Sequence, residues 1–358
     1  MSRSSGEKML QSLALHMHAA SASSAVADEP DVVLALVPSG HRSLPILQAA
    51  FASAAVPSKL LQIQTAADIP SPCNARGMVV VHNQGGTLAG TLDTDAELRL
   101  ALEPGVLPSL EWVHTMSAGV DHLPHELFAQ HAPPITLTHN QGVSDQSLAE
   151  FAILGLLYFS KQVPLMTAQY NAEEWAGFQT RELRGATLGV IGLGSIGCEV
   201  VRAAVHGFGM SAMGYRRSSA VAPPTVEELV TMVPPDATGL AALLSASDFV
   251  VMALPHTAGT VHLLGAEQLA LLKPSAVVVN IGRGSSIDAL ALAAALESGA
   301  LRGAALDVVE TEPLEDGHPL WAVGSEKLLL SPHTMDKCVC THPTLRRLAR
   351  PLLPHAVF

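Results

Sequence analysis

The sequence predicts an α/β protein made of two doubly wound units, each a parallel sheet with helices on both faces. Three observations lead to this prediction. Short apolar runs of strand length alternate with helix-compatible segments along most of the chain. The alternation is interrupted once, by a long apolar segment near the middle. The 358 residues are also enough for two ordinary domains.

The first unit is expected to span residues 31–143, completed by residues 334–358 from the end of the chain. Its strand candidates are the apolar runs at 31–37, 59–64, 77–82, 110–116 and 135–139. Residues 1–30 are rich in Ser and Ala and lack the compact apolar core of a secretory signal. We expect this segment to be a flexible arm; an organelle transit peptide is the alternative.

The second unit is expected to span residues 144–333. It opens with SDQSLAEFAILGLLYFSKQVPLM, which is apolar on nearly all sides and predicts one long buried helix with Ser144 as its N-cap. Six strand candidates follow, with helix-like segments between them. These six runs predict a doubly wound sheet, and they lie at 187–192, 211–215, 248–254, 276–282, 301–309 and 327–331.

Composition narrows the class of protein. Hydrophobic residues make up 48% of the chain and charged residues 15%, which is typical of a well-buried protein, and no apolar run is long enough to span a membrane. The net charge of −12 argues against general binding to nucleic acid or anionic membranes. The four cysteines show neither a disulfide framework nor a metal-binding pattern, so we expect reduced thiols, no metal and a cytoplasmic protein.

A glycine-rich turn marks the start of the second unit's sheet. The sequence Gly192-Leu193-Gly194-Ser195-Ile196-Gly197 follows a strand candidate and opens a helix candidate. In this context the first glycine permits the tight turn, the second lets a pyrophosphate approach the backbone, and the third lets the helix pack on the strand. The helix start offers N–H groups to phosphates. We therefore predict a dinucleotide site.

The next strand candidate ends in Arg216 and Arg217, where a dinucleotide site that prefers NAD has a carboxylate for the ribose hydroxyls. Arginines there attract a 2′-phosphate through charge-assisted hydrogen bonds. Together with Ser218 they predict a phosphate pocket and a preference for NADP(H), with NAD as the second option. The alternative is that the arginines stack on adenine or face solvent.

Three ionisable residues follow the later strand candidates in order. They are Arg283, Glu312 and His333. Because ligands bind at the carboxyl ends of the strands in an open α/β sheet, we expect the three side chains to share one site. These residue types suit hydride transfer between a 2-oxo acid and a 2-hydroxy acid. The arginine can bind the substrate carboxylate, and the histidine can act as the acid or base. The glutamate carboxylate would raise the histidine pKa.

The chain resembles the D-isomer-specific, NAD(P)-dependent 2-hydroxyacid dehydrogenases from roughly Leu110 to Thr334. The segments that carry the resemblance are MSAGVDHL, HNQGVSDQSLAE, RGATLGVIGLGSIG, ALPHTAGTVHLLG, LLKPSAVVVNIGRG, ALDVVETEPL, HPLW and SPHT. After SPHT the family often continues with small residues and glycine, whereas this chain continues Met-Asp-Lys-Cys.

The resemblance implies two Rossmann-like or flavodoxin-like domains with a cleft between them, in a homodimer with the 144–163 helix at its interface. It implies Arg283 as the substrate-binding arginine, Glu312 as the partner of the histidine and His333 as the acid/base. The backbone of Ala118 and Gly119 would bind the substrate carboxylate. The cofactor site would further include Leu254, Pro255, Ile281, Gly282 and Asp307.

The expected reaction is reduction of a small 2-oxo acid such as glyoxylate or hydroxypyruvate. Formate dehydrogenases of this family carry glutamine where this chain has Glu312, and phosphoglycerate dehydrogenases carry a long regulatory domain. The alternative from another class is a non-catalytic, dinucleotide-sensing corepressor, which can retain the same three residues.

Overall fold

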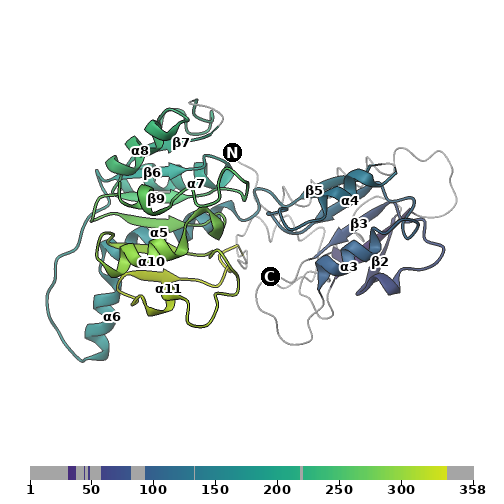
Figure 1. The fold of residues 1–358 in the computed structure, drawn as a ribbon, viewed down its shortest axis with the longest axis horizontal. Helices are drawn as coiled ribbons and strands as arrows, with labels where there is room; N and C mark the ends of the chain where they lie inside the picture. The colour runs from purple at the N-terminus through teal and green to yellow at the C-terminus, as the bar shows by residue number, and fades with distance from the viewer. Residues whose placement is uncertain are drawn as a thin grey trace. The chain divides into compact units, whose positions relative to one another are not determined.

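The computed structural model describes residues 31–37, 44, 47–48, 58–81, 93–132, 134–217 and 221–336. The described residues before Ser144 form one compact unit and those from Ser144 onward form another. Each unit contains one sheet in which every strand pair is parallel (Figure 1). The predicted α/β class is confirmed.

The first unit has a five-stranded sheet of order β2-β1-β3-β4-β5, the flavodoxin-like order. Along β1, Leu34 and Leu36 are buried in the core on one face, while Val33 and Ala35 are buried in the core on the other. This period of two buries apolar side chains on both faces of the sheet. The elements are β1 (Asp31–Leu36), β2 (Ser58–Ile63), η1 (Ala66–Asp68), β3 (Gly77–Val80), α3 (Thr94–Ala101), β4 (Trp112–Thr115), α4 (His125–Gln130) and β5 (Thr136–His139).

The second unit has a seven-stranded sheet of order β12-β11-β10-β9-β6-β7-β8. Six of these strands lie at the predicted runs. The seventh, β8 (Val230–Met232), was not predicted; it is a three-residue strand at the sheet edge and is too short to give a periodic signal. The other strands are β6 (Thr187–Ile191), β7 (Ser211–Tyr215), β9 (Phe249–Met252), β10 (Val277–Asn280), β11 (Gly303–Leu306) and β12 (Leu328–Leu330).

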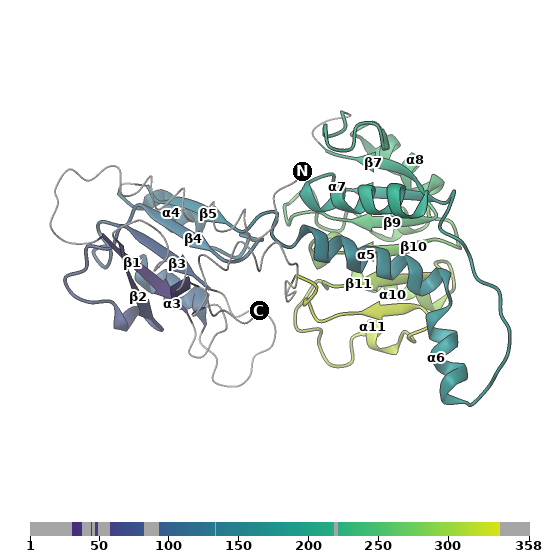
Figure 2. The same cartoon turned by 180° about the vertical axis from the view of Figure 1, so that it is seen from behind.

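Helices cover both faces of this sheet, and each face has its own apolar core. One core contains residues of α5 and α7, and the other contains residues of α8, α9 and α10. Figures 1 and 2 show these two faces in turn. The segments are α5 (Asp145–Ser160), α6 (Val163–Asn171), α7 (Ser195–Arg202), η2 (Ala203–Gly207), α8 (Ala237–Ala246), α9 (Ala266–Leu269), η3 (Gly284–Ser286), α10 (Ala289–Glu297) and α11 (Pro319–Ala322).

The prediction of one long helix over 144–166 is wrong, because α5 and α6 are separate helices that meet at an angle of 62°. Gln162, between them, has a left-handed φ of 57°. Pro164 lies in the first turn of α6. A proline has no N–H to donate and clashes with the carbonyl four residues earlier, so the helix cannot continue through it.

The α5–α6 pair also bears on membrane spanning. Among the described residues, no single helix is both long enough and apolar enough to cross a membrane, and this bent pair satisfies the criteria of length and composition only when its two helices are taken together. Most of α5 is buried within the second unit.

Candidate active site

The predicted residues of the second unit lie at the carboxyl ends of its parallel strands. The strand order reverses between β6 and β9. At such a switch point the loops of neighbouring strands turn in opposite directions and leave room for a ligand. The glycine turn follows β6, the two arginines follow β7, and Arg283 follows β10.

The glycine turn has the geometry that its sequence predicts. Gly192 adopts a φ of 101°, and a Cβ on it would lie 2.5 Å from the carbonyl oxygen of Ala253. A Cβ on Gly197 would collide with the carbonyl oxygen of Gly192. Gly194 is the N-cap of α7, and a Cβ there would meet nothing within 4 Å. The backbone is therefore open beside the first N–H groups of α7, which lack intrahelical acceptors.

Arg216 and Arg217 follow β7 directly; Arg216 is half-buried and Arg217 is exposed. The Arg217 side chain extends to the loop after β9, where a Cβ on Gly259 would lie 2.8 Å from Nη1. Within the described part of the chain, neither guanidinium forms an ion pair. Ser218, the third member of the predicted phosphate pocket, lies outside the described residues.

The loops after β9 and β10 lie against each other. A Cβ on Gly282 would come 2.5 Å from the backbone N of Leu254. Ile281 is buried beside it, whereas Pro255 is exposed. The structure thus brings together the four residues expected on this side of the cofactor site.

Arg283 is held by two residues that the sequence reasoning missed. Asn280 is fully buried and donates from Nδ2 to the Arg283 carbonyl oxygen (3.0 Å), while its Oδ1 accepts from the Gly282 N–H (3.1 Å). The Ser286 hydroxyl donates to the same Arg283 carbonyl (2.7 Å). The asparagine at the end of a strand, two residues before a glycine, was the available signal, because such side chains often cap their own turn.

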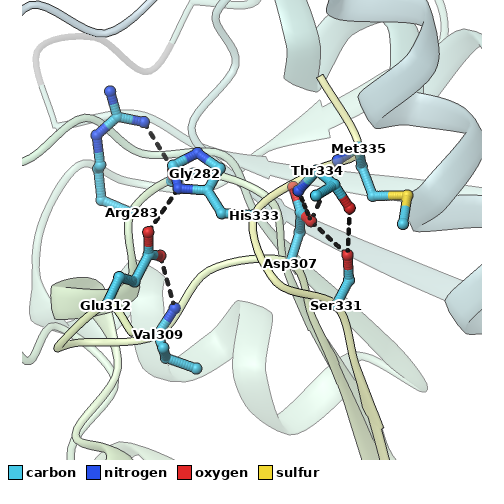
Figure 3. A network of polar contacts seen from close by, with 9 residues as sticks. All are labelled: Gly282, Arg283, Asp307, Val309, Glu312, Ser331, His333, Thr334 and Met335. Atoms are coloured by element: carbon cyan, nitrogen blue, oxygen red, sulfur yellow. Dashed lines mark hydrogen bonds and ion pairs between the residues drawn. The ribbon is translucent and has the colours of Figure 1, made fainter. Parts of the chain in front are cut away.

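His333 and Glu312 form a direct pair. The distance from His333 Nδ1 to Glu312 Oε2 is 2.7 Å, and Glu312 Oε1 accepts from the Val309 N–H at 3.1 Å (Figure 3). The hydrogen bond to Glu312 raises the His333 pKa; burial opposes this, but the charges of Glu312, Asp336 and Asp307 add to the increase, and the pKa lies above its ordinary value.

The Glu312 pKa moves the other way. Burial alone would raise it, but the hydrogen bond and charge of His333, the Val309 N–H and the charge of Arg283 outweigh burial and lower it. Both pKa shifts favour the state in which the imidazole carries the proton and the carboxylate is ionised. Nδ1 donates to Glu312, which leaves Nε2 to exchange a proton with a bound molecule.

Asp307 holds the loop that carries His333. It is 1% exposed, and its Oδ1 accepts from the Ser331 hydroxyl (2.8 Å) and from the N–H groups of Thr334 (3.0 Å) and Met335 (3.3 Å) (Figure 3). The His333 N–H donates to the Asp307 carbonyl at 2.8 Å. These bonds maintain His333 at a left-handed φ of 50°, which a residue other than glycine rarely adopts without such support.

The start of α5 holds the same loop from its other side. The Ser147 hydroxyl donates to the Met335 carbonyl (2.5 Å) and the Ser144 hydroxyl to the Asp336 carbonyl (3.1 Å). Ser144 occupies the predicted N-cap position, but its side chain does not cap α5. Nothing in the local sequence indicates this long-range use of the two hydroxyls.

Two features suit a bound dinucleotide. One is the open backbone at Gly194. The other is Asp307 Oδ2, which is buried without a hydrogen-bond partner and so offers an acceptor to an incoming amide. Among the described residues, no group of three or more His, Cys, Asp or Glu is arranged to hold a metal ion.

Ala118 and Gly119 belong to the first unit. They lie in the loop after β4, where Ala118 is exposed and Gly119 is half-buried. The exposed position at the carboxyl end of a parallel strand is where ligand contacts are expected in such a sheet.

Comparison with known proteins identifies the family. Residues 153–334 match the model of the D-isomer specific 2-hydroxyacid dehydrogenase NAD binding domain. D-3-phosphoglycerate dehydrogenase of Methanocaldococcus jannaschii is 36% identical over 226 residues, covering 63% of this chain and 41% of that protein. Glyoxylate/hydroxypyruvate reductase B of Shigella boydii is 35% identical over 246 residues, covering 67% of this chain and 72% of the relative.

A solved structure extends the similarity across both units. The NADPH-dependent glyoxylate/hydroxypyruvate reductase of Sinorhizobium meliloti, in complex with NADP and malonate, superposes with a TM-score of 0.64 at 26% identity, covering 87% of this chain and 88% of that one. This chain spans only part of the length of the curated relatives that it matches, 41% in the case of the M. jannaschii protein. The chain belongs to the D-isomer specific 2-hydroxyacid dehydrogenase family.

Proposed function

We propose that this protein is a reductase of small 2-oxo acids, such as glyoxylate or hydroxypyruvate, that prefers NADPH. The observation that carries the proposal is the 2.7 Å pair of His333 and Glu312 beside Arg283. A protonated imidazole and a guanidinium are what a 2-oxo acid needs, because reduction adds a proton to its carbonyl oxygen and its carboxylate requires a cation.

The three residues divide the work in this scheme. Arg283 binds the substrate carboxylate and polarises the neighbouring carbonyl. His333 donates the Nε2 proton to the carbonyl oxygen, and Glu312 stabilises the imidazolium and orients the ring through Nδ1. The nicotinamide supplies the hydride to the carbonyl carbon. The product is the D-2-hydroxy acid, and oxidation runs through the same groups in reverse.

The backbone of two further segments would bind ligand groups. We propose that the N–H groups of Ala118 and Gly119 contact the substrate carboxylate. We propose that the N–H groups at Ser195, Ile196 and Gly197 bind the pyrophosphate. Leu254, Pro255, Ile281 and Gly282 would line the nicotinamide half of the site, where Asp307 Oδ2 would accept from the carboxamide.

The cofactor preference rests on Arg216 and Arg217, together with Ser218. All three follow β7 in the sequence, the strand next to β6, where a 2′-phosphate would lie. The two arginines have no carboxylate partner among the described residues. Glyoxylate/hydroxypyruvate reductases among the relatives, one of them described as NADPH-dependent, support the substrate class and the cofactor.

The test is oxidation of NADPH and of NADH with glyoxylate, hydroxypyruvate and pyruvate, with wild type and R217S. We expect a higher kcat/KM with NADPH, and a loss of about tenfold in R217S with NADPH but not with NADH, because a hydrogen bond between two charged groups contributes about 1.5–3 kcal/mol. R184S, which changes an exposed arginine before β6, is the control.

Other outcomes decide between the alternatives. A preference for NADH would overturn the phosphate pocket while leaving the reductase. Binding of cofactor without turnover of any 2-oxo acid would favour the dinucleotide-sensing function.

We also propose a homodimer with the segment 144–163 at its interface, extended by α6 (Val163–Asn171). Exposed apolar side chains occur along these helices and just after them: Leu154 (49% exposed) in α5, Leu165 (38%), Met166 (41%) and Tyr170 (84%) in α6, and Trp175 (104%) beyond α6. Exposed apolar side chains of this kind suit burial against a second copy of the chain. Light scattering after size-exclusion chromatography should give twice the monomer mass for the wild type. The Y170E variant should shift the measured mass toward that of a single chain.

A further inference from the structure

The loop after β4 is held by its carbonyl groups. The Met116 carbonyl oxygen accepts from Asn140 Nδ2 at 2.9 Å, and the Ser117 carbonyl oxygen accepts from the Asn140 N–H at 3.1 Å. The Ala118 carbonyl oxygen lies 2.9 Å from His139 Nδ1. A carbonyl can only accept, so this ring nitrogen donates. Three consecutive carbonyl groups are therefore bonded to the residues at the end of β5.

The next residues of the loop continue the pattern. The Val120 carbonyl oxygen lies 2.7 Å from His125 Nε2 and also accepts from the Leu123 N–H. By contrast, the N–H groups of Ala118, Gly119 and Val120 have no acceptor among the described residues. A loop whose carbonyls are bonded and whose N–H groups are left over is suited to receive an anion.

The anchor of this arrangement is a buried histidine. His114 is fully buried, and its Nε2 lies 3.2 Å from Asn140 Oδ1. Because the Met116 carbonyl needs a donor, the Asn140 amide must turn its NH₂ toward Met116 and its oxygen toward His114. The His114 Nε2 therefore carries a hydrogen, and the orientation of the amide is fixed.

The other ring nitrogen continues the chain of hydrogen bonds. His114 Nδ1 lies 2.9 Å from the hydroxyl of Thr138, the residue directly opposite it in the β4–β5 pair. The Trp112 indole N–H donates to the same hydroxyl at 2.8 Å. The Thr138 hydroxyl also lies 3.5 Å from the Val113 carbonyl oxygen, a longer contact than its 2.9 Å approach to His114 Nδ1. With a neutral ring, the shorter contacts run from indole to hydroxyl, hydroxyl to imidazole, imidazole to amide, and amide to the Met116 carbonyl.

We propose that His114 and Asn140 are positioning residues for substrate binding, which hold the loop Met116–Gly119 so that the N–H groups of Ala118 and Gly119 meet the substrate carboxylate. A polar chain in an apolar core is costly unless every member is bonded, but once bonded it specifies a single arrangement. The inference rests on the proposed function, because it assigns the loop to the carboxylate of the 2-oxo acid.

The principal test is N140D, which keeps the shape of the side chain but replaces the donor to Met116 with an oxygen. We expect the KM for glyoxylate and the Kd for oxamate, a non-reducible analogue, to rise about tenfold through loss of this hydrogen bond. The Kd for NADPH should stay unchanged, because its proposed site is in the other unit. H131Q is the control: its ring bonds the Leu107 carbonyl in the same unit, away from the loop.

A second pair of variants separates hydrogen bonding from packing. H114F fills the core but cannot donate to Asn140, whereas the Gln in H114Q can. We expect H114F to raise the glyoxylate KM and H114Q to restore most of the affinity. H139A, which removes only the bond to the Ala118 carbonyl, replaces N140D if the latter does not fold. Hydrogen–deuterium exchange at the amides of Met116, Ser117 and Asn140, which are hydrogen-bonded in the wild type, should be faster in N140D and H114F than in wild type and H131Q.

The outcomes are distinct. Unchanged KM and exchange in folded N140D, or equal damage in H114Q and H114F, would overturn the positioning role. If wild type turns over no 2-oxo acid and binds no oxamate, the proposed function fails. The exchange rates then decide on their own whether His114 and Asn140 hold the loop.

Discussion

The charge of Glu312 should set the pH at which reduction begins to fail. Glu312→Gln keeps the size of the side chain and an oxygen to accept from His333 Nδ1, so it removes chiefly the negative charge. Reduction needs a protonated His333, and kcat/KM therefore falls as pH rises through the His333 pKa. Because Glu312 raises that pKa, the fall in the variant should occur at lower pH.

The magnitude follows from the geometry of the pair. A hydrogen bond between charged groups contributes about 1.5–3 kcal/mol. The His333 and Glu312 side chains are 26% and 37% exposed, so solvent screening reduces this to about 1–1.5 kcal/mol. Since one pKa unit corresponds to about 1.4 kcal/mol, the descending limb should move about one pH unit toward acid.

The assay is the pH dependence of kcat/KM for NADPH-dependent glyoxylate reduction. Wild type and E312Q should converge in acid and differ by about tenfold above both pKa values. The oxidation limb, which needs neutral His333, should move in the same direction. E310Q is a matched control, because Glu310 lies two residues away and contacts His262 instead (2.6 Å). A limb that stays in place in E312Q, or moves toward alkali, would refute the reasoning.

The same pair links pH to folding. His333 has a raised pKa in the folded protein, so its contribution is complete below the ordinary histidine pKa of about 6.5 and is lost as pH rises through the folded value. Glu312 must also be ionised. The difference in unfolding free energy between wild type and E312Q should therefore be largest near pH 5–6, roughly between the two ordinary values.

Two further predictions concern the glycine turn and the loop of His333. G197A should destabilise the protein by about 1–3 kcal/mol in urea unfolding, because its Cβ would collide with the Gly192 carbonyl. G194A places a Cβ in open space, so it should leave stability unchanged but weaken NADPH binding in calorimetry. An equal loss of stability in the two variants would contradict this difference. D307A should lower the unfolding free energy by about 1–3 kcal/mol, because it leaves the partly buried N–H groups of Thr334 and Met335 and the Ser331 hydroxyl without their acceptor. It should also reduce kcat, because His333 loses its support. A stable, fully active D307A would show that this support is dispensable.

The strands of the fold were predictable because their signal is local. Runs such as FVVMAL and AVVV are apolar throughout, and strands of a parallel sheet covered on both faces require this composition. The break between α5 and α6 had a local signal as well, in Pro164, but the continuous hydrophobicity of the segment outweighed it. The short edge strand β8 has too few residues to be recognised by pattern.

The site was predictable where a residue follows a strand, and hidden where its support comes from far along the chain. His333 and Glu312 are 21 residues apart and meet because their strands are neighbours. The contacts of Ser144 and Ser147 with the His333 loop span 192 and 188 residues. The chain of hydrogen bonds through His114 depends on strand register, which sequence pattern alone does not give.

The strand order of the second sheet has an evolutionary consequence. β7, which precedes the two arginines, is separated from β12, which precedes His333, by four intervening strands, or about 24 Å at the usual spacing between strands. Changes at sites so far apart usually combine independently. A lineage with this fold can therefore exchange one cofactor for another without rebuilding its proton donor, and each trait can be selected on its own.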